Sequence, residues 1–256
     1  MELKKRIRHG WDISARGYSD VIQDELDPDK KIKWLEVILD NAPQKDDLKI
    51  LDVGCGPGFF SMILSEAGFD VTGIDFSAKM IEEAEKNTEL METEPVLLVM
   101  DTQDPDFPDD TFDLIVSRNV VWCLSEPEKA YNNWLNILAP GGVLEVFDGD
   151  YLKDLREPDK NPKYMHDSYA EEYKKLYGKE PKCSFTKDMY PEARGWRKEL
   201  PLVKEKRPDW DVGFCKKAGY ADVKYEWVND KVFSDERDIY LHKNNPYFLL
   251  TAKKPD

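Results

Sequence analysis

The stretch Leu51-Asp52-Val53-Gly54-Cys55-Gly56-Pro57-Gly58-Phe59 decides the fold of this chain. The apolar run from Leu48 to Val53 predicts a buried strand before the glycines, and the run 59–64 predicts a helix after them, which Gly68 ends. Glycines at these positions let the backbone turn tightly and approach a ligand. The free amide groups at the start of the helix favour an anionic group. The stretch therefore predicts a ligand-binding turn between a strand and a helix.

An acid lies at the end of the next predicted strand, Asp70 to Ile74. Asp75 follows the glycine loop at about 20 residues, where a carboxylate can accept hydrogen bonds from two ribose hydroxyls. Glycines and acid together predict an adenosine-containing cofactor. The loop has the pattern G-x-G-x-G with an internal proline, whereas the dinucleotide fingerprint is G-x-G-x-x-G. The spacing therefore departs from that of a nicotinamide dinucleotide site.

Strands and helices alternate on both sides of this loop, which is typical of a parallel sheet wound with helices. The further predicted strands are Pro95 to Met100, Phe112 to Ser117, Val143 to Phe147, Asp222 to Val228 and Pro246 to Ala252. The further predicted helices are Lys31 to Asp40, Ala78 to Leu90 with Ser77 as cap, Glu126 to Leu138, and Trp210 to Ala218. The pattern predicts an α/β fold, a Rossmann-like, doubly wound and mostly parallel sheet of about seven strands.

The alternation stops between Asp150 and Pro208. This segment has no clean strand pattern, and its composition is too rich in aromatic residues, mostly tyrosines, for a disordered linker. We interpret it as a helical cap inserted after the fifth strand. The expected organisation is a cofactor-binding core with N-terminal lead-in helices at 1–149, the cap at 150–208, and a final helix and two strands at 209–256 that complete the sheet.

Five segments in this order resemble the class I S-adenosylmethionine-dependent methyltransferases, in particular the small-molecule type called methyltransferase family 11. The resemblance covers roughly residues 11–147. Its segments are the glycine loop with Asp52, Val71-Thr72-Gly73-Ile74-Asp75-Phe76-Ser77, Met100-Asp101-Thr102, Phe112-Asp113-Leu114-Ile115-Val116-Ser117-Arg118-Asn119, and Leu138-Ala139-Pro140-Gly141-Gly142-Val143-Leu144.

The resemblance implies S-adenosylmethionine as the cofactor and gives each segment a role. Asp52 with the glycine loop would hold the methionine part, Asp75 the ribose, and Phe76 would flank the adenine. Asp101 would meet the adenine amino group, and the loop after the fourth strand would face the sulfonium. The implied cofactor-binding residues are Tyr18, Asp52, Gly54, Gly56, Gly58, Asp75, Phe76, Met80, Asp101, Thr102, Arg118 and Asn119.

Tyr18 belongs to an upstream segment, Trp11-Asp12-Ile13-Ser14-Ala15-Arg16-Gly17-Tyr18, which is similar to the W-D-x-x-A-x-x-Y lead-in of that family. In relatives this lead-in folds over the cofactor, with its tyrosine near the methionine end. The alternative is that Trp11 and Tyr18 are packing aromatics of a terminal helix. No catalytic residue is assigned, and Asn119 and His166 are the candidates.

Two further patterns carry competing interpretations. Asn244-Asn245-Pro246-Tyr247 resembles the N-P-P-Y box of amino-group methyltransferases, but it opens the last strand, where a proline is ordinary. Asp148 and Asp150, after the fifth strand, could hold magnesium. A substrate-orienting or solvated role is favoured over metal, because Ser117 and Arg118 stand where such enzymes have an acid. No metal is expected.

Composition restricts the partners. The 256 residues carry a formal net charge of −15, which disfavours a nucleic acid substrate. The basic run at residues 4–8 is interpreted as a solvated helix face. No apolar run is long enough to span a membrane, the N-terminus lacks a signal-peptide pattern, and the four cysteines are scattered, so we expect a soluble cytoplasmic protein, a monomer or homodimer.

The sequence thus favours methyl transfer to a small-molecule acceptor by in-line displacement. Two alternatives stay open: a protein or, less favoured, an RNA acceptor, and a non-catalytic or NAD-binding relative of the fold. Nothing in the sequence identifies the acceptor or the atom that is methylated.

Overall fold

The computed structural model describes residues 2–157, 165–182, 189–233 and 235–256. A seven-stranded sheet runs through its centre in the order β3-β2-β1-β4-β5-β7-β6. The strands are β1 (Lys49–Val53), β2 (Asp70–Asp75), β3 (Val96–Val99), β4 (Phe112–Arg118), β5 (Leu138–Asp148), β6 (Ala221–Trp227) and β7 (Phe248–Lys253). Strands β1 to β5 are mutually parallel, and β7 is antiparallel to both of its neighbours. The predicted Rossmann-like architecture is confirmed.

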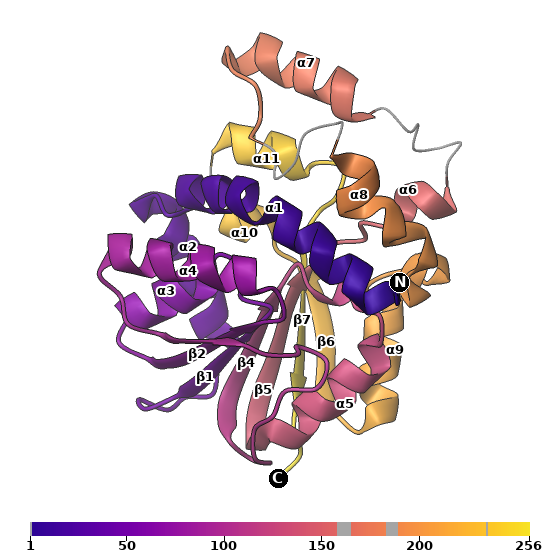
Figure 1. The fold of residues 1–256 in the computed structure, drawn as a ribbon. Coiled ribbons are helices and arrows are strands. Elements are labelled where there is room, and N and C mark those ends of the chain that lie inside the picture. The colour runs from indigo at the N-terminus through magenta and orange to yellow at the C-terminus, as the bar shows by residue number, and fades with distance from the viewer. Residues whose placement is uncertain (1, 158–164, 183–188, 234) are drawn as a thin grey trace.

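Helices cover both faces of the sheet (Figure 1). One face carries α2 (Pro28–Asn41), α3 (Phe59–Glu66) and α10 (Asn229–Val232), packed in a core around Trp34, Phe60 and Phe147. The other face carries α5 (Pro127–Ile137) and α9 (Asp209–Ala218), packed around Tyr131 and Trp134. Helix α4 (Ala78–Met91) flanks β2 and β3.

The N-terminal helix α1 (Leu3–Glu25) runs across the carboxyl edge of the sheet, between α4 and α8 (Tyr190–Arg194) (Figure 1). It packs closely against α8, because a Cβ atom on Gly10 would lie 2.3 Å from the carbonyl oxygen of Ala193. Arg194 completes this contact: its guanidinium lies 4.0 Å from the Trp11 ring and donates to the carbonyl of Gly10 and the hydroxyl of Ser14. The carboxyl edge is therefore covered by the N-terminal segment.

The segment predicted as a cap is helical in its described part. It contains α6 (Lys153–Arg156), α7 (Met165–Tyr177), α8, and the 3₁₀ turns η2 (Gly195–Glu199) and η3 (Pro201–Lys204). Helix α7 lies beyond the others, next to α11 (Glu236–His242) (Figure 1). Trp196, Leu200 and Leu202 instead belong to the core beside β5. The second half of the segment is thus part of the main core.

Element boundaries differ from the predicted ones where side chains or turns decide them. Helix α2 begins three residues earlier than expected, since the Asp27 carboxylate accepts from the Asp29 amide and Pro28 occupies the first turn. Strand β5 begins at Leu138 rather than Val143, because Leu138 pairs with Phe112 before an irregularity. A further 3₁₀ element in the described part of the chain, η1 (Val121–Cys123), follows β4. No helix among the described residues meets the length and hydropathy needed to span a membrane.

Candidate functional site

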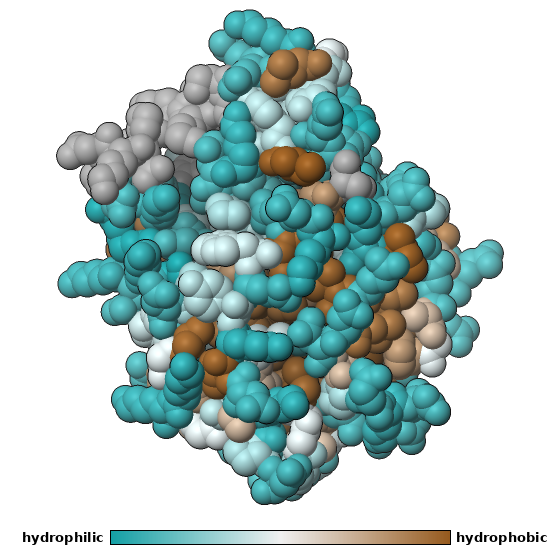
Figure 2. Space-filling model, turned by 180° about the vertical axis from the view of Figure 1, so that it is seen from behind, coloured by the Kyte–Doolittle hydropathy of each residue, from teal (hydrophilic) through white to brown (hydrophobic). Residues whose placement is uncertain are grey.

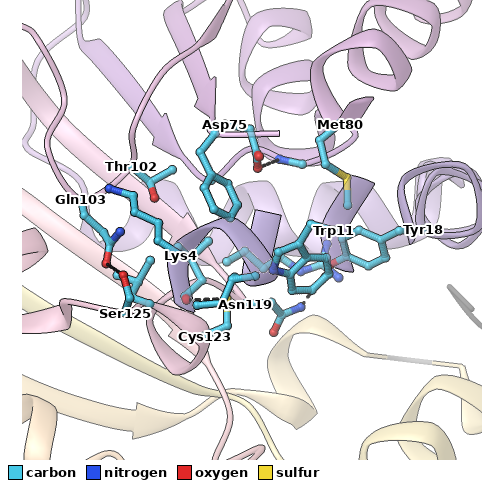
Figure 3. Close-up of a pocket in the computed structure, with 17 residues that line it drawn as sticks. Lys4, Trp11, Tyr18, Asp75, Met80, Thr102, Gln103, Asn119, Cys123 and Ser125 are labelled. Carbon is cyan, nitrogen blue, oxygen red and sulfur yellow. Dashed lines mark hydrogen bonds between the residues drawn. The ribbon is translucent and has the colours of Figure 1, made fainter. Parts of the chain in front are cut away.

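A pocket lies at the carboxyl edge of the sheet, beneath α1 (Figure 3). Its walls come from α1, from the loops after β1, β2 and β4, and from the segment after β3. The lining residues are Lys4, Ile7, Trp11, Tyr18, Gly54, Gly56, Asp75, Phe76, Met80, Thr102, Gln103, Arg118, Asn119, Val120, Cys123, Leu124 and Ser125. Most of the predicted cofactor-binding residues are therefore brought together in one place.

The glycine loop forms the floor of this pocket. Gly54, Gly56 and Gly58 have φ angles of +71°, +51° and +92°, a region that favours glycine. A Cβ on Gly54 would lie 2.3 Å from a methyl of Val120, so this glycine is required by packing as well. A Cβ on Gly56 would meet only the Tyr18 ring, at 3.6 Å. Tyr18 of α1 therefore lies directly over the loop.

Asp75 ends β2 and organises the loop from the other side. Its carboxylate accepts from the amide of Gly56 at 3.1 Å and from the amide of Ser77 at 2.8 Å. Burial raises its pKa to about 6 in spite of these bonds. Ser77 caps α4 through the amide of Met80, which places Phe76 and Met80 in the pocket wall. A carboxylate with further lone pairs thus faces the pocket, as ribose recognition requires.

Three predicted cofactor residues lie outside the pocket walls: Asp101, which pairs with Lys4, and the two loop residues Asp52 and Gly58. The Asp52 carboxylate accepts from the amide of Ser61 at 2.9 Å and from its hydroxyl at 2.7 Å. It thereby fixes the first turn of α3, and burial raises its pKa to about 7. Gly58 is the N-cap of α3 and faces Ala84. Both residues shape the loop, and the structure gives them no direct contact with the pocket.

The segment after β3 holds an ion pair that the sequence did not predict. Asp101 pairs with Lys4 of α1, and the Lys4 side chain extends along the pocket toward Thr102 (Figure 3). Arg6 pairs with Glu199. The basic run at the N-terminus, expected as a solvated face, is thus partly used to hold α1 over the site. Thr102 lines the pocket, and its carbonyl accepts from the Trp134 indole at 2.8 Å.

Arg118 closes the pocket at the end of β4. Its guanidinium lies 4.5 Å from the Trp34 ring and 4.7 Å from the Phe59 ring, and it pairs with Glu25 at 2.6 Å. The side chain is 8% exposed, and although burial lowers its pKa, the carboxylate of Glu25 keeps that pKa above the ordinary value. A permanent positive charge is therefore fixed beside the glycine loop.

Asn119, a predicted catalytic candidate, joins three tyrosines. Its φ of +61° is unusual for a residue other than glycine. The hydroxyl of Tyr151 donates to Oδ1 at 2.7 Å, and Nδ2 donates to the hydroxyl oxygens of Tyr247 at 2.6 Å and Tyr18 at 3.4 Å. Its amide is thus engaged by protein groups, which makes it a positioning residue.

Sequence reasoning missed several residues of this site. Tyr247 belongs to the pattern that resembles N-P-P-Y, at the predicted start of the last strand. Its contact with Asn119 depends on the antiparallel pairing of β5 and β7, which the pattern does not reveal. Trp11 was noticed in the lead-in without a committed role, and it lies beside Tyr18 with ring centroids 6.0 Å apart (Figure 3). Lys4, Gln103, Cys123 and Ser125 carried no motif signal.

Other predicted groups lie elsewhere. Asp148 is fully buried, and its Oδ2 accepts from Arg207 at 2.6 Å. Asp150 is partly exposed and pairs with Arg156, so each acid has a basic partner. Among the described residues no cluster of His, Cys, Asp or Glu could hold a metal ion. His166 lies in α7, but its side chain falls outside the described ones.

Helix α1 nearly fills the pocket in this structure. The free space is about 50 Å³. Sites for drug-sized ligands typically measure about 300–1,000 Å³. Side chains of α1, among them Lys4, Trp11 and Tyr18, line this small space. A ligand with an adenosine group therefore requires these side chains or the helix itself to shift.

Comparison with known proteins gives a family match. Residues 51–146 match the model of a methyltransferase domain. The chain is similar to phosphatidylethanolamine N-methyltransferase of Cereibacter sphaeroides, 40% identical over 100 residues, which are 38% of this chain and 49% of that protein. It is also similar to ubiquinone biosynthesis O-methyltransferase of Coxiella burnetii, 31% identical over 134 residues, which are 50% of this chain and 57% of that protein. These alignments span about half the length of either relative.

Solved structures show the same fold. Phosphoethanolamine N-methyltransferase 2 of Haemonchus contortus, in complex with phosphomonomethylethanolamine and S-adenosylhomocysteine, superposes with a TM-score of 0.58 at 17% identity. The match covers 87% of this chain and 52% of that one. At this identity the likeness establishes the fold alone.

Proposed function

Because residues 51–146 are a methyltransferase domain of the class I, S-adenosylmethionine-dependent type, we propose that this chain transfers a methyl group to a small-molecule acceptor. The observation that carries the proposal is the pocket itself. Its floor is a glycine loop with left-handed φ angles, and one wall carries a buried carboxylate that is hydrogen-bonded to that loop. This combination suits an adenosine-containing donor.

The pocket residues divide into two ends. At one end Asp75 would accept from the ribose hydroxyls, with Phe76 and Met80 against the adenine. At the other end Tyr18, Arg118 and Asn119 would surround the methionine part. S-adenosylmethionine supplies an electrophilic methyl carbon at a sulfonium, and aromatic faces such as that of Tyr18 attract a cation of this kind.

We propose that the chain contributes position and exclusion of water rather than proton transfer. Burial raises the pKa of Tyr18 to about 12 and that of Cys123 to about 12, so neither side chain ionises near neutral pH. Asp75, with a pKa of about 6, belongs to the adenosine end. Holding the acceptor atom at about 3–3.5 Å in line with the departing group is then the main catalytic effect. Such an acceptor must reach the pocket in its nucleophilic form.

We propose that residues 150–208 take part in acceptor selection indirectly, rather than as a separate cap that contacts the acceptor. None of the described residues of this segment lines the pocket, but Tyr151 is linked to the pocket by its hydrogen bond to Asn119. Arg194 locks α8 to α1 next to Trp11. The segment would therefore act through the position of α1 and of the tyrosines around Asn119.

Calorimetric titration tests the cofactor. S-adenosylmethionine and S-adenosylhomocysteine should bind in a one-to-one ratio, and NAD should not. Binding of NAD without S-adenosylmethionine would instead support the alternative of an NAD-binding relative. If the protein binds none of the three compounds, the proposed function is refuted and only the methyltransferase fold remains established.

The acceptor class needs a transfer experiment. Methyl-labelled S-adenosylmethionine would be incubated with the protein and with separated small-molecule, protein and RNA fractions of a cell extract. Ethanolamine phosphate, phosphatidylethanolamine vesicles and a catechol serve as defined acceptors, since the curated relatives include N- and O-methyltransferases. Label should enter the small-molecule fraction or a defined acceptor. Label confined to protein would favour the alternative acceptor class, and a heat-treated sample controls for chemical methylation.

A further inference from the structure

Strand β6 forms one outer edge of the sheet, and no described strand lies beyond it (Figure 1). It spans seven residues, whereas β3 at the opposite edge spans four. The amide of Val228 donates to the carbonyl of Tyr247 beside β7, and backbone groups alternate sides along a strand. The backbone groups of Glu226 therefore also face β7, while those of Tyr225 and Trp227 face outward. An outward row of donors and acceptors at a sheet edge is a template for pairing with another strand.

Two aromatic side chains make one face of this edge apolar. Tyr225 is 41% exposed and Trp227 is 52% exposed, and their ring centroids lie 6.0 Å apart. Trp227 continues the row to Phe248 of the core, with ring centroids 6.3 Å apart. Apolar patches set among hydrophilic side chains also occur on the back of the molecule, as Figure 2 shows. What distinguishes β6 is that its two exposed rings stand beside outward backbone groups.

The other face of β6 carries charges of opposite sign. Lys224 and Glu226 point to this face, because side chains alternate along a strand. Glu226 pairs with Lys231 at 2.6 Å, whereas no acid among the described residues pairs with Lys224. The stretch Val223-Lys224-Tyr225-Glu226-Trp227 is therefore apolar, basic, aromatic, acidic and apolar in turn. This order is self-complementary when two copies are laid antiparallel.

We propose that β6 docks a second copy of this chain, whose own β6 pairs with it antiparallel in the register centred on Tyr225. A two-fold axis perpendicular to the sheet then relates the copies, and the two sheets become continuous. Lys224 of each copy meets Glu226 of the other, and Trp227 meets Val223. Aromatic, β-branched and opposite-charge pairs are the favourable cross-strand pairs.

The orientation of the backbone fits this register. Tyr225 and Trp227, whose backbone groups face outward, fall in the hydrogen-bonded pairs of the new ladder. Lys224 and Glu226 fall in the alternate pairs, in which the strands lie closer and side chains interact more strongly. A register shifted by one residue would instead place Lys224 opposite Tyr225, so both the charge pairs and the aromatic pairs would be lost.

Two features oppose the association. Each copy carries a formal net charge of −15, so the copies repel each other at long range. One strand pair is also a small interface beside the roughly 1,200–2,000 Å² that a standard complex buries. We therefore expect a reversible dimer, whose fraction rises with protein concentration and with moderate salt, because salt screens the long-range repulsion more than the contacts across the interface.

Sedimentation equilibrium of the intact chain, from micromolar to submillimolar concentration, measures the association. The wild type should form a dimer and no larger species, because the two-fold pairing occupies the β6 edge in both copies. Tyr225→Pro should abolish the dimer, since proline removes an outward N–H and a central aromatic ring. A proline is tolerated at an edge position whose N–H faces solvent, so the thermal unfolding of this variant should stay cooperative.

Charge reversal tests the register. Lys224→Glu places two acids opposite each other at both symmetric contacts, and Glu226→Lys places two bases there. Each single variant should weaken dimerisation about tenfold, as expected for two cross-strand charge pairs that turn from attraction to repulsion. The double variant Lys224→Glu/Glu226→Lys restores opposite charges and should regain most of the wild-type affinity. Lys231→Ala, which removes only the partner of Glu226 within the chain, is the matched control and should leave the dimer intact.

Three results would contradict the proposal. A wild type that stays monomeric across the whole concentration series would overturn it. A dimer that survives both Tyr225→Pro and the single charge reversals would place the interface elsewhere. A double variant that dimerises as weakly as the single ones would refute the register centred on Tyr225. If Tyr225→Pro does not fold, the three charge variants carry the test, because their substitutions lie on exposed side chains.

Discussion

The two ends of the pocket are built in different ways. The end that we propose holds adenosine is local: the Asp75 carboxylate accepts from the amide of Gly56, 19 residues earlier, and from the amide of Ser77, two residues later. The other end, which we propose surrounds the methionine part, is built around Asn119, whose side chain meets Tyr18, Tyr151 and Tyr247 from three other parts of the chain. Only the first kind of construction leaves a compact sequence motif, so the two ends differ in how far sequence alone can reveal them.

The largest expected effect concerns the floor that supports both ends. Gly54→Ala should cost about 3 kcal/mol or more, because the new Cβ would lie 2.3 Å from Val120 and the φ of +71° disfavours it. For a chain of this size that lowers Tm by roughly 6–12 °C. Gly68→Ala is the matched control, since Gly68 has a φ of +92° with nothing within 4 Å. If Gly54→Ala and Gly68→Ala lower Tm equally, the contact with Val120 does not add to the cost of replacing Gly54.

Asp75→Asn should weaken S-adenosylmethionine binding about ten- to a hundredfold, because a charge-assisted contact with the ribose contributes roughly 1.5–3 kcal/mol. The amide keeps one acceptor oxygen for the backbone amides, so the fold should persist. Asp70→Asn, at the exposed start of the same strand, should leave affinity unchanged. A folded Asp75→Asn protein with wild-type affinity would show that this acid holds the loop and not the cofactor.

Titration of Asp75 should change cofactor affinity and folding stability in opposite directions as the pH rises. Ribose recognition needs the carboxylate, so affinity should fall below pH 6 and be about tenfold weaker at pH 5. Stability should move the other way. The folded-state pKa values of Asp75, about 6, and Asp52, about 7, lie above the ordinary value of 3.8, so protonation favours the folded state. Their contribution is present below pH 3.8 and is lost as pH rises through 6–7.

Titrations at several pH values with Asp75→Asn as the reference decide this point. The variant should lose the pH dependence of binding between pH 5 and 7. Denaturant unfolding of the wild type without ligand should give a contribution from these two acids that decreases with rising pH. A binding curve that stays flat in the wild type would remove Asp75 from the cofactor contacts.

Sequence alone was sufficient to predict the sheet and the position of Asp75 beside the glycine loop. Alternating apolar runs predicted the strands to within a few residues, and the glycine loop with Asp75 lies where the motif places it. Asp101 shows the limit, because its ion pair joins it to Lys4, 97 residues away, and no local pattern records that contact. The contacts of Asn119 likewise depend on how α1, β5 and β7 assemble. Contacts between residues so far apart in the sequence depend on how the elements pack, and residue spacing along the chain does not reveal them.

The smallest expected effect tests whether the two ends are independent. Tyr247→Phe removes the 2.6 Å bond to Asn119 at a buried position and should cost about 1 kcal/mol of stability. Asp75 and Tyr247 share no hydrogen-bond partner among the described residues, so S-adenosylhomocysteine affinity should change less than twofold. In the double variant with Asp75→Asn the effects on binding should add within about 0.5 kcal/mol. A coupling well above this value would mean that the glycine loop transmits changes between the ends, since Tyr18 lies over Gly56 and also meets Asn119. Tyr18→Phe in the same cycle then locates the connection, because it removes the hydroxyl contact with Asn119 and leaves the ring over the loop.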